Sequence, residues 1–211
     1  MSEHVVLLGD SVFDNGSYTK GLPDVVTHLR EILPPGTAAT LLAVDGSTTA
    51  DLEDQLARLP ANGTRAVVSV GGNDALLNAD ILDLPVSSTR EALHLFGARA
   101  SKFEESYRAA ILGVTRRIPR VLACTIYNGN LPDDQAPSAR VALMMFNDAI
   151  LRVAFELRIE VIDLRLICAD ASDYANPIEP SGSGGAKIAR AIAGALGFLE
   201  ESGSPSRVFA G

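Results

Sequence analysis

Short apolar runs alternate with amphipathic stretches along the chain, and this alternation constrains the fold more than any other feature. The apolar runs have the length of β-strands and cover residues 4–9, 37–43, 65–70, 120–126 and 159–163. Each run is almost continuously apolar, which is typical of strands covered on both faces of a parallel sheet. The sequence therefore predicts an α/β protein with five parallel strands.

The intervals between these runs have the spacing of helices. Apolar residues recur at helical intervals between Leu22 and Leu33, and the PPG sequence at 34–36 ends that segment. Three further helices are predicted over 49–59, 137–157 and 184–200, and another follows the capping-box sequence at 88–91. This order of elements predicts a three-layer α/β/α sandwich, whose ligands bind beyond the carboxyl ends of the strands. We expect one domain over residues 1–201 and a C-terminal tail over 202–211.

Composition and charge exclude several classes of function. The chain has 211 residues, 47% of them hydrophobic, a net charge of −8 and no basic cluster longer than Arg116-Arg117. It therefore lacks the positive surface of a nucleic-acid-binding protein. No apolar run approaches the roughly 18 residues of a membrane span. The start, MSEHVVLLGDS, has an acidic residue where a signal peptide is positively charged, so we expect a cytoplasmic protein.

The two cysteines predict neither a disulfide nor a metal site. Cys124 and Cys168 lie in apolar runs and lack CxxC spacing. Isolated cysteines in such runs are typically buried thiols. We expect no metal ion and no cofactor.

Polar residues follow each of the first three predicted strands. They are Gly9-Asp10-Ser11, Asp45-Gly46-Ser47-Thr48 and Gly71-Gly72-Asn73-Asp74. In a parallel sheet these turns meet at one edge. A serine that faces a glycine N–H and an asparagine amide has the parts for acyl transfer, namely a nucleophile and donors to an oxyanion. We expect Asp10 and Asp74 to hold their loops by hydrogen bonds.

Each of these three blocks also has an ordinary alternative. Ser11 can cap a turn, because Gly-Asp-Ser is a common turn composition. Gly46 can be a plain turn glycine, and Asn73 can form an Asx-type turn. The functional reading depends on the three blocks occurring together.

Together the three blocks resemble those of SGNH hydrolases of the GDSL family, over nearly the whole chain. The matching segments are GDS with Ser11, VDGSTTADL with Gly46 and GGND with Asn73. The resemblance implies a flavodoxin-like fold with Ser11 as nucleophile. It implies an oxyanion hole from the backbone N–H groups of Ser11 and Gly46 and the side chain of Asn73. The implied substrates are small-molecule esters, thioesters or acetylated sugars.

The fourth block of the family departs from its usual pattern in this chain. The family has Asp-x-x-His-Pro-Ser before the last helix, where the histidine is the general base and the aspartate orients it. The matching stretch here is NPIEPS, residues 176–181. Glu179 stands in place of the histidine and Asn176 in place of the aspartate.

The chain has three histidines, at positions 4, 28 and 94. His4 opens the first strand, roughly 20 Å from Ser11 at 3.3 Å per residue, and is excluded as the base. His28 lies on the polar face of the first predicted helix, where we expect a solvated surface residue. His94 follows the start of the helix after Asn73 and is the alternative base.

Glu179 is the favoured base on this reading. Glutamate has an ordinary pKa of about 4.3, so it needs burial to act near neutral pH. A hydrogen bond from Asn176, or a proton shared with Asp173, can orient its carboxyl.

Two functions therefore stay open. One is a hydrolase or acyltransferase that works through a Ser11 acyl-enzyme, and the other is a catalytically silent protein that binds an acylated or carbohydrate ligand.

Two segments are candidate walls of the site. The longest covers residues 73–88, and the second covers 127–138. The first wall contains four leucines and an isoleucine, for which two roles stay open: they could line an acyl pocket, or they could pack the domain. They are Leu76, Leu77, Ile81, Leu82 and Leu84. The short loops favour small acyl groups.

Overall fold

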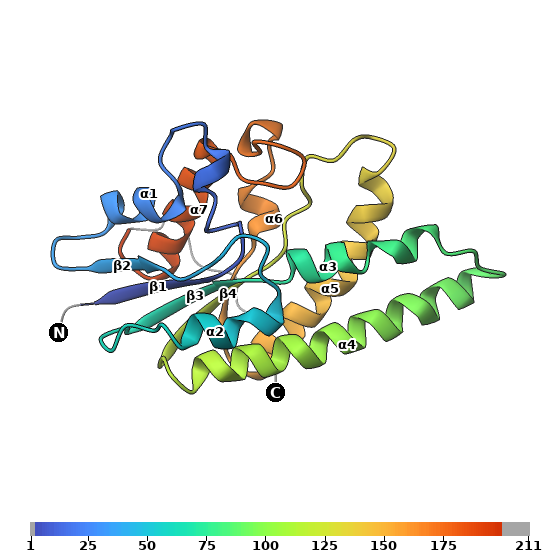
Figure 1. The fold of residues 1–211 in the computed structure, drawn as a ribbon, viewed down its shortest axis with the longest axis horizontal. Helices are drawn as coiled ribbons and strands as arrows, with labels where there is room; N and C mark the ends of the chain where they lie inside the picture. The colour runs from blue at the N-terminus through green and yellow to red at the C-terminus, as the bar shows by residue number, and fades with distance from the viewer. Residues whose placement is uncertain (1–2, 200–211) are drawn as a thin grey trace.

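The structure is a computed structural model that describes residues 3–199, and it has the predicted three-layer architecture (Figure 1). All strands are parallel and pair in the order β2-β1-β3-β4-β5. They are β1 (His4–Gly9), β2 (Ala38–Leu41), β3 (Arg65–Ser69), β4 (Arg120–Cys124) and β5 (Glu160–Ile162). The predicted fold class is confirmed. The expected tail, 202–211, lies outside the described residues.

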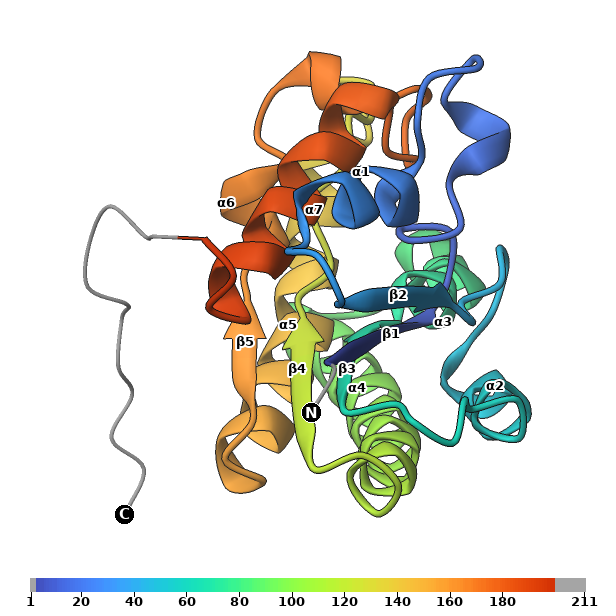
Figure 2. The ribbon, with the colours of Figure 1, turned by 90° about the vertical axis from the view of Figure 1, so that its left-hand side faces the viewer.

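The helices cover the two faces of the sheet in separate layers. The α-helices are α1 (Val25–Ile32), α2 (Leu52–Leu56), α3 (Gly72–Leu77), α4 (Thr89–Thr115), α5 (Ala136–Glu156), α6 (Leu164–Ile167) and α7 (Gly182–Ala195). Short 3-10 helices are η1 (Gly16–Tyr18), η2 (Thr49–Asp51), η3 (Ala79–Asp83) and η4 (Ala171–Asp173). Figure 2 shows α1, α6 and α7 together on one side of the sheet. Among the helices of residues 3–199, none has the length and apolar character that crossing a membrane requires.

The alternating side chains of the strands build one core on each face. Val5 and Leu7 of β1 join the core beneath α1 and α7, whereas Val6 and Leu8 join the core of α2, α4 and α5. All four are fully buried. Successive side chains of a strand point to opposite faces, so a continuous apolar run supplies both cores. The predicted buried thiols are also confirmed, because Cys124 and Cys168 are buried and unpaired.

The helix α4 begins at the predicted capping sequence and positions part of the site. Ser88 caps its start by accepting a hydrogen bond from the Glu91 N–H. From there α4 runs 27 residues, and its first half extends beyond the carboxyl ends of the strands (Figure 1). α3, η3 and the first half of α5 accompany it there. The predicted helix over 184–200 instead spans 182–195, because Ser181 caps it by accepting from the Gly184 N–H.

The end of β1 approaches the end of β3 so closely that only glycine fits at position 9. A Cβ atom on Gly9 would lie 1.7 Å from the carbonyl oxygen of Ser69, and the φ angle of Gly9 is +127°. The side chain of Gln55 fixes this strand end by accepting from the Gly9 N–H at 2.8 Å and donating to its carbonyl at 2.7 Å. The chain is thereby aimed into the turn that carries Ser11.

We predict that Gly9→Ala destabilises the protein by about 3 kcal/mol or more, because backbone strain and overlap add. Gly36→Ala is the matched control, since Gly36 has a φ of +88° but open space around its Cβ position. Strain alone costs about 1–2 kcal/mol there. Urea unfolding measures both losses. Equal losses in the two variants would show that the approach to Ser69 is not a constraint.

Candidate active site

Ser11 sits in a tight turn directly beyond β1. The Asp10 N–H donates to the Ser69 carbonyl at 3.0 Å, and the N–H groups of Phe13 and Asp14 both donate to the Asp10 carbonyl at 3.1 Å. Ser11 is only 8% exposed and lines a cavity at the edge of the sheet. Within residues 3–199, its N–H group has no hydrogen-bond acceptor, so it is free to bind an oxyanion.

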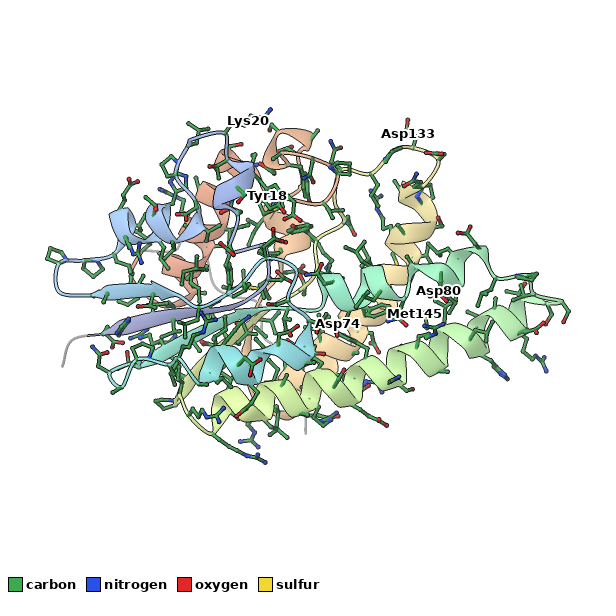
Figure 3. All side chains as sticks on the ribbon, in the orientation of Figure 1. Tyr18, Lys20, Asp74, Asp80, Asp133 and Met145 are labelled. Atoms are coloured by element: carbon green, nitrogen blue, oxygen red, sulfur yellow. The ribbon has the colours of Figure 1, made fainter. Side chains whose placement is uncertain are left out.

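The loop after β2 is held against α3 by Asp74, which Figure 3 labels near the start of that helix. The Asp74 carboxylate accepts from the Thr49 N–H at 3.1 Å and from the Thr49 hydroxyl at 2.7 Å. The expected structural role of Asp74 is thus confirmed. Gly46 turns the same loop with a φ of +81°, a conformation that favours glycine.

Asn73 connects this loop to the serine. Its side-chain amide donates to the Ser47 carbonyl at 2.9 Å, and its second N–H is left for a ligand. Asn73 lines the cavity together with Ser11. Gly46 is exposed and does not line the cavity, although in the described part of the chain its N–H has no acceptor. The structure therefore brings Ser11 and Asn73 together and leaves Gly46 beside them in the adjoining loop.

Glu179 enters the cavity from the loop before α7. It is 7% exposed, and its Oε2 atom is buried without a hydrogen-bond partner among the residues described. Burial raises the pKa of its carboxyl above the ordinary value, while a polar contact with the Ser11 hydroxyl lowers this pKa in part. The Ser11 hydroxyl therefore lies within reach of the Glu179 carboxyl.

Several hydrogen bonds hold the loop that carries Glu179. The hydroxyl of Tyr127, in the loop after β4, donates to the Ile178 carbonyl at 2.6 Å. The Asn130 N–H donates to the Pro177 carbonyl at 2.8 Å. The Asn176 side chain accepts from the Glu179 N–H at 2.9 Å. These bonds fix the backbone at Glu179 and leave its carboxyl free to react.

The structure corrects both expected partners of the Glu179 carboxyl. Asn176 binds the backbone N–H groups of Ile178 and Glu179, because its short side chain closes an Asx-type turn. Asp173 is fully buried and pairs with Lys187 at 2.8 Å, so it does not share a proton with Glu179.

Asp10 is the carboxyl that accompanies Glu179 instead. It is 3% exposed and lines the same cavity. Burial raises its pKa to about 7, with smaller contributions from the negative charges of Glu179 and Asp74. One of its oxygens accepts from the Val12 N–H at 3.1 Å, so Asp10 also holds the turn, as expected. No lysine or arginine is among the described residues that line this cavity.

Sequence and structure comparisons identify the family. The chain matches the model of the GDSL-like Lipase/Acylhydrolase family over residues 7–184. The chain belongs to this GDSL family. Its members are ester hydrolases, so the resemblance seen in the three sequence blocks is confirmed at the level of the family.

Solved structures share the GDSL fold at low sequence identity. The extracellular lipase of Streptomyces rimosus is 14% identical with a TM-score of 0.66, over 92% of this chain and 99% of that chain. The acetylxylan esterase Axe2 of Geobacillus stearothermophilus is 18% identical with a TM-score of 0.66, over 93% and 95%. LAE5, an alpha/beta hydrolase from the Lake Arreo metagenome, is 18% identical with a TM-score of 0.68, over 94% and 97%. A search of curated protein sequences finds no match.

None of the three histidines reaches the GDSL serine. His4 bonds to Asn62 and Thr40 at the far end of the sheet, which agrees with its exclusion as the general base. The expectation for His28 was wrong, since it is half-buried and its Nε2 atom lies 3.1 Å from the Gly182 carbonyl. His94 is exposed on the first half of α4 and does not line the cavity, although Phe96 of the same helix does.

The cavity has a volume of about 150 Å³ and is bounded by both predicted walls. From the first wall Leu76, Ile81 and Leu82 line it, while Leu77 and Leu84 do not. Residues 127–129 and Leu131 line it from the second wall. One face of α5 also lines the cavity. This face was not predicted as a wall, although the apolar residues of the helix recur at helical spacing. Within residues 3–199 no cluster of His, Cys, Asp and Glu is arranged to hold a metal ion.

The buried Asp10 carboxyl predicts a pH-dependent stability. A folded-state pKa of about 7 lies above the ordinary value of 3.8, so the folded protein binds this proton more tightly than the unfolded chain. The free energy of unfolding therefore falls as pH rises from about 4 to about 7. We predict that the isosteric variant Asp10→Asn is more stable than the parent at about pH 8, by on the order of 2–4 kcal/mol, and similar to it at about pH 4.

Urea unfolding at the two pH values measures this difference. Asp133→Asn is the control, because Asp133 is an exposed carboxyl, and the stability of this variant follows the parent at both. If the stability of Asp10→Asn relative to the parent were the same at about pH 4 and at about pH 8, the raised pKa of Asp10 would be contradicted.

Proposed function

We propose that this GDSL protein is a serine ester hydrolase in which Glu179 replaces the histidine as general base. The observation that carries the proposal is the buried Glu179 carboxyl, which shares the cavity with Ser11 and has an oxygen without a partner among the described residues. None of the described residues that line the cavity is a histidine. The substrate class is a small-molecule ester, thioester or acetylated compound.

The reaction proceeds in two steps through an acyl-enzyme. The Ser11 Oγ atom attacks the carbonyl carbon of the ester, and its proton passes to Glu179. The Ser11 N–H group and the Asn73 amide, both in the cavity, bind the oxyanion that develops. The protonated Glu179 then gives its proton to the departing alcohol. In the second step a water gives its proton to Glu179, attacks the acyl carbon and releases Ser11, which recovers the proton.

Burial gives the glutamate the basicity that the reaction needs. An ordinary carboxyl is a weak base toward a serine hydroxyl, and a raised pKa strengthens it. A proton on Asp10 limits the negative charge of the site, because Asp10 has a pKa of about 7 and lies in the same cavity. Asp10 is thus largely neutral at slightly acid pH, and the two carboxyls of the cavity are not both charged there.

A catalytically silent binding protein is the second candidate, and the observation that favours it is the replacement of both members of the usual acid–base pair at Asn176 and Glu179. Hydrolysis of a short activated ester separates the two functions. The complete set of Ser11, Asn73 and a buried carboxyl favours the enzyme.

We predict that Ser11→Ala lowers kcat/KM for such an ester by about 1,000-fold or more. Glu179→Gln keeps the shape of the side chain but not its basicity, and we expect a loss of about 100- to 10,000-fold. His94→Ala is the control and should keep the parent rate, because His94 lies outside the cavity. Full activity in Glu179→Gln, or a loss in His94→Ala, would remove Glu179 from the role of base.

The second prediction concerns the pH profile. Glu179 must be ionised to accept a proton, so kcat/KM of the parent falls as pH drops through the raised pKa of this group. In Glu179→His the base has an ordinary pKa of about 6.5. Because a different group then accepts the proton, we expect its acid limb to be displaced from that of the parent. Identical limbs in parent and variant would show that residue 179 does not set the protonation step.

A further inference from the structure

We infer that the site takes an unbranched aliphatic acyl group of about six carbons, an inference that rests on the proposed function. The cavity that contains Ser11 has a volume of about 150 Å³. An apolar cavity of about this size in another protein binds benzene, a ligand of six carbons. An acetyl group would leave most of this space unfilled.

The lining selects an aliphatic chain. Along α5, the side chains of Ala139, Ala142, Leu143 and Phe146 line the cavity at intervals of three and four residues, which places them on one helix face. Phe96 of α4 adds an aromatic side chain. Leu76 and Leu82 of the opposite wall are partly exposed, so an apolar chain that enters would remove their surface from water.

Two polar side chains of the lining, Thr125 and Asn78, are already engaged. The Thr125 hydroxyl donates to Asp163 at 2.9 Å and accepts from the Leu164 N–H. The Asn78 amide donates to the Asp74 carbonyl at 2.8 Å and accepts from Arg99. A sugar inside the cavity would lose hydrogen bonds to water without replacing them at these two residues. The part of the cavity beside Thr125 and Asn78 therefore suits an acyl chain better than a carbohydrate.

The wall of the cavity at Phe146 is tightly packed, and it limits the length of the chain. Phe146 is 4% exposed, and its ring packs against that of Phe103 with 4.9 Å between the centroids. The ring of Phe103 lies close to the backbone at Gly71, where a Cβ atom would come within 2.9 Å of it. An acyl chain that reaches Phe146 therefore meets a wall that is packed from behind.

A series of p-nitrophenyl esters from acetate to decanoate tests the inference. We expect kcat/KM to peak near hexanoate, at least about tenfold above acetate, because each buried methylene contributes about a fourfold gain. Ala142→Phe fills the cavity and should lower the value for hexanoate about tenfold or more while changing that for acetate less than about twofold. Leu143→Ala should move the optimum to longer chains.

Val141→Phe is the matched control, because Val141 is next to Ala142 on α5 but is 62% exposed and points out of the cavity. This control should keep the chain-length profile of the parent. A profile that is flat or highest at acetate, and that Ala142→Phe leaves unchanged, would overturn the inference while the esterase itself stands.

A binding measurement separates the inference from the proposed function. In Ser11→Ala, calorimetry should detect methyl hexanoate binding at least about tenfold tighter than methyl acetate, and the added Ala142→Phe substitution should abolish this difference. If the parent hydrolyses no ester but this preference is observed, the proposed function fails and the acyl cavity stands. If Ser11→Ala shows no preference, the acyl cavity fails whatever the parent hydrolyses.

Discussion

The close approach of β1 to β3 at Gly9 is the constraint on which the site depends. Because no side chain fits between Gly9 and the Ser69 carbonyl, the chain turns directly from the sheet into the serine turn. Gln55 satisfies both backbone groups of Gly9 and also donates to the Ser47 hydroxyl at 3.2 Å. One buried glutamine thus fixes the end of β1 relative to the loop after β2. The positions of the nucleophile and of the oxyanion donors follow from this single junction.

The chemistry of the site depends in turn on burial without a nearby cation. Glu179 and Asp10 lie in one cavity whose described lining holds no lysine or arginine, so burial dominates the pKa of both. A histidine would be neutral before it accepts the proton of Ser11, whereas a glutamate is negative. The site therefore needs a carboxyl whose backbone is held in place, and the hydrogen bonds of Tyr127 and Asn176 hold it. The carboxyl also needs to be free of a salt bridge, because a salt bridge would lower its pKa and weaken it as a base.

Much of the fold and part of the site could be predicted from the sequence. Apolar runs specify strands that are buried on both faces, so the sheet and its edge follow from local pattern. Ser11 and Asn73 then meet because both follow strands of one parallel sheet. Gly46 has the predicted turn conformation but stays outside the cavity, a difference of side that no local pattern contains.

The remaining features depend on long-range contacts that spacing does not encode. The Asn176 side chain could bond either to a carboxyl or to the backbone, and in the turn it accepts from two backbone N–H groups. His28 looked solvated on its own helix, but α7 lies against that helix and buries part of the ring. His94 lies at an exposed position of α4 outside the cavity, while α5 supplies a cavity wall from far along the chain.

The most direct test of the account is the rate at which a fluorophosphonate probe labels Ser11 as a function of pH. The account predicts that mass spectrometry finds the probe on Ser11, and that the labelling rate of the parent rises as Glu179 ionises. In Glu179→Gln the rate should be slow and should not rise over the same acid range. Labelling of Ser11 that is equally fast in parent and variant, or no labelling of Ser11 at any pH, would contradict a nucleophile activated by Glu179.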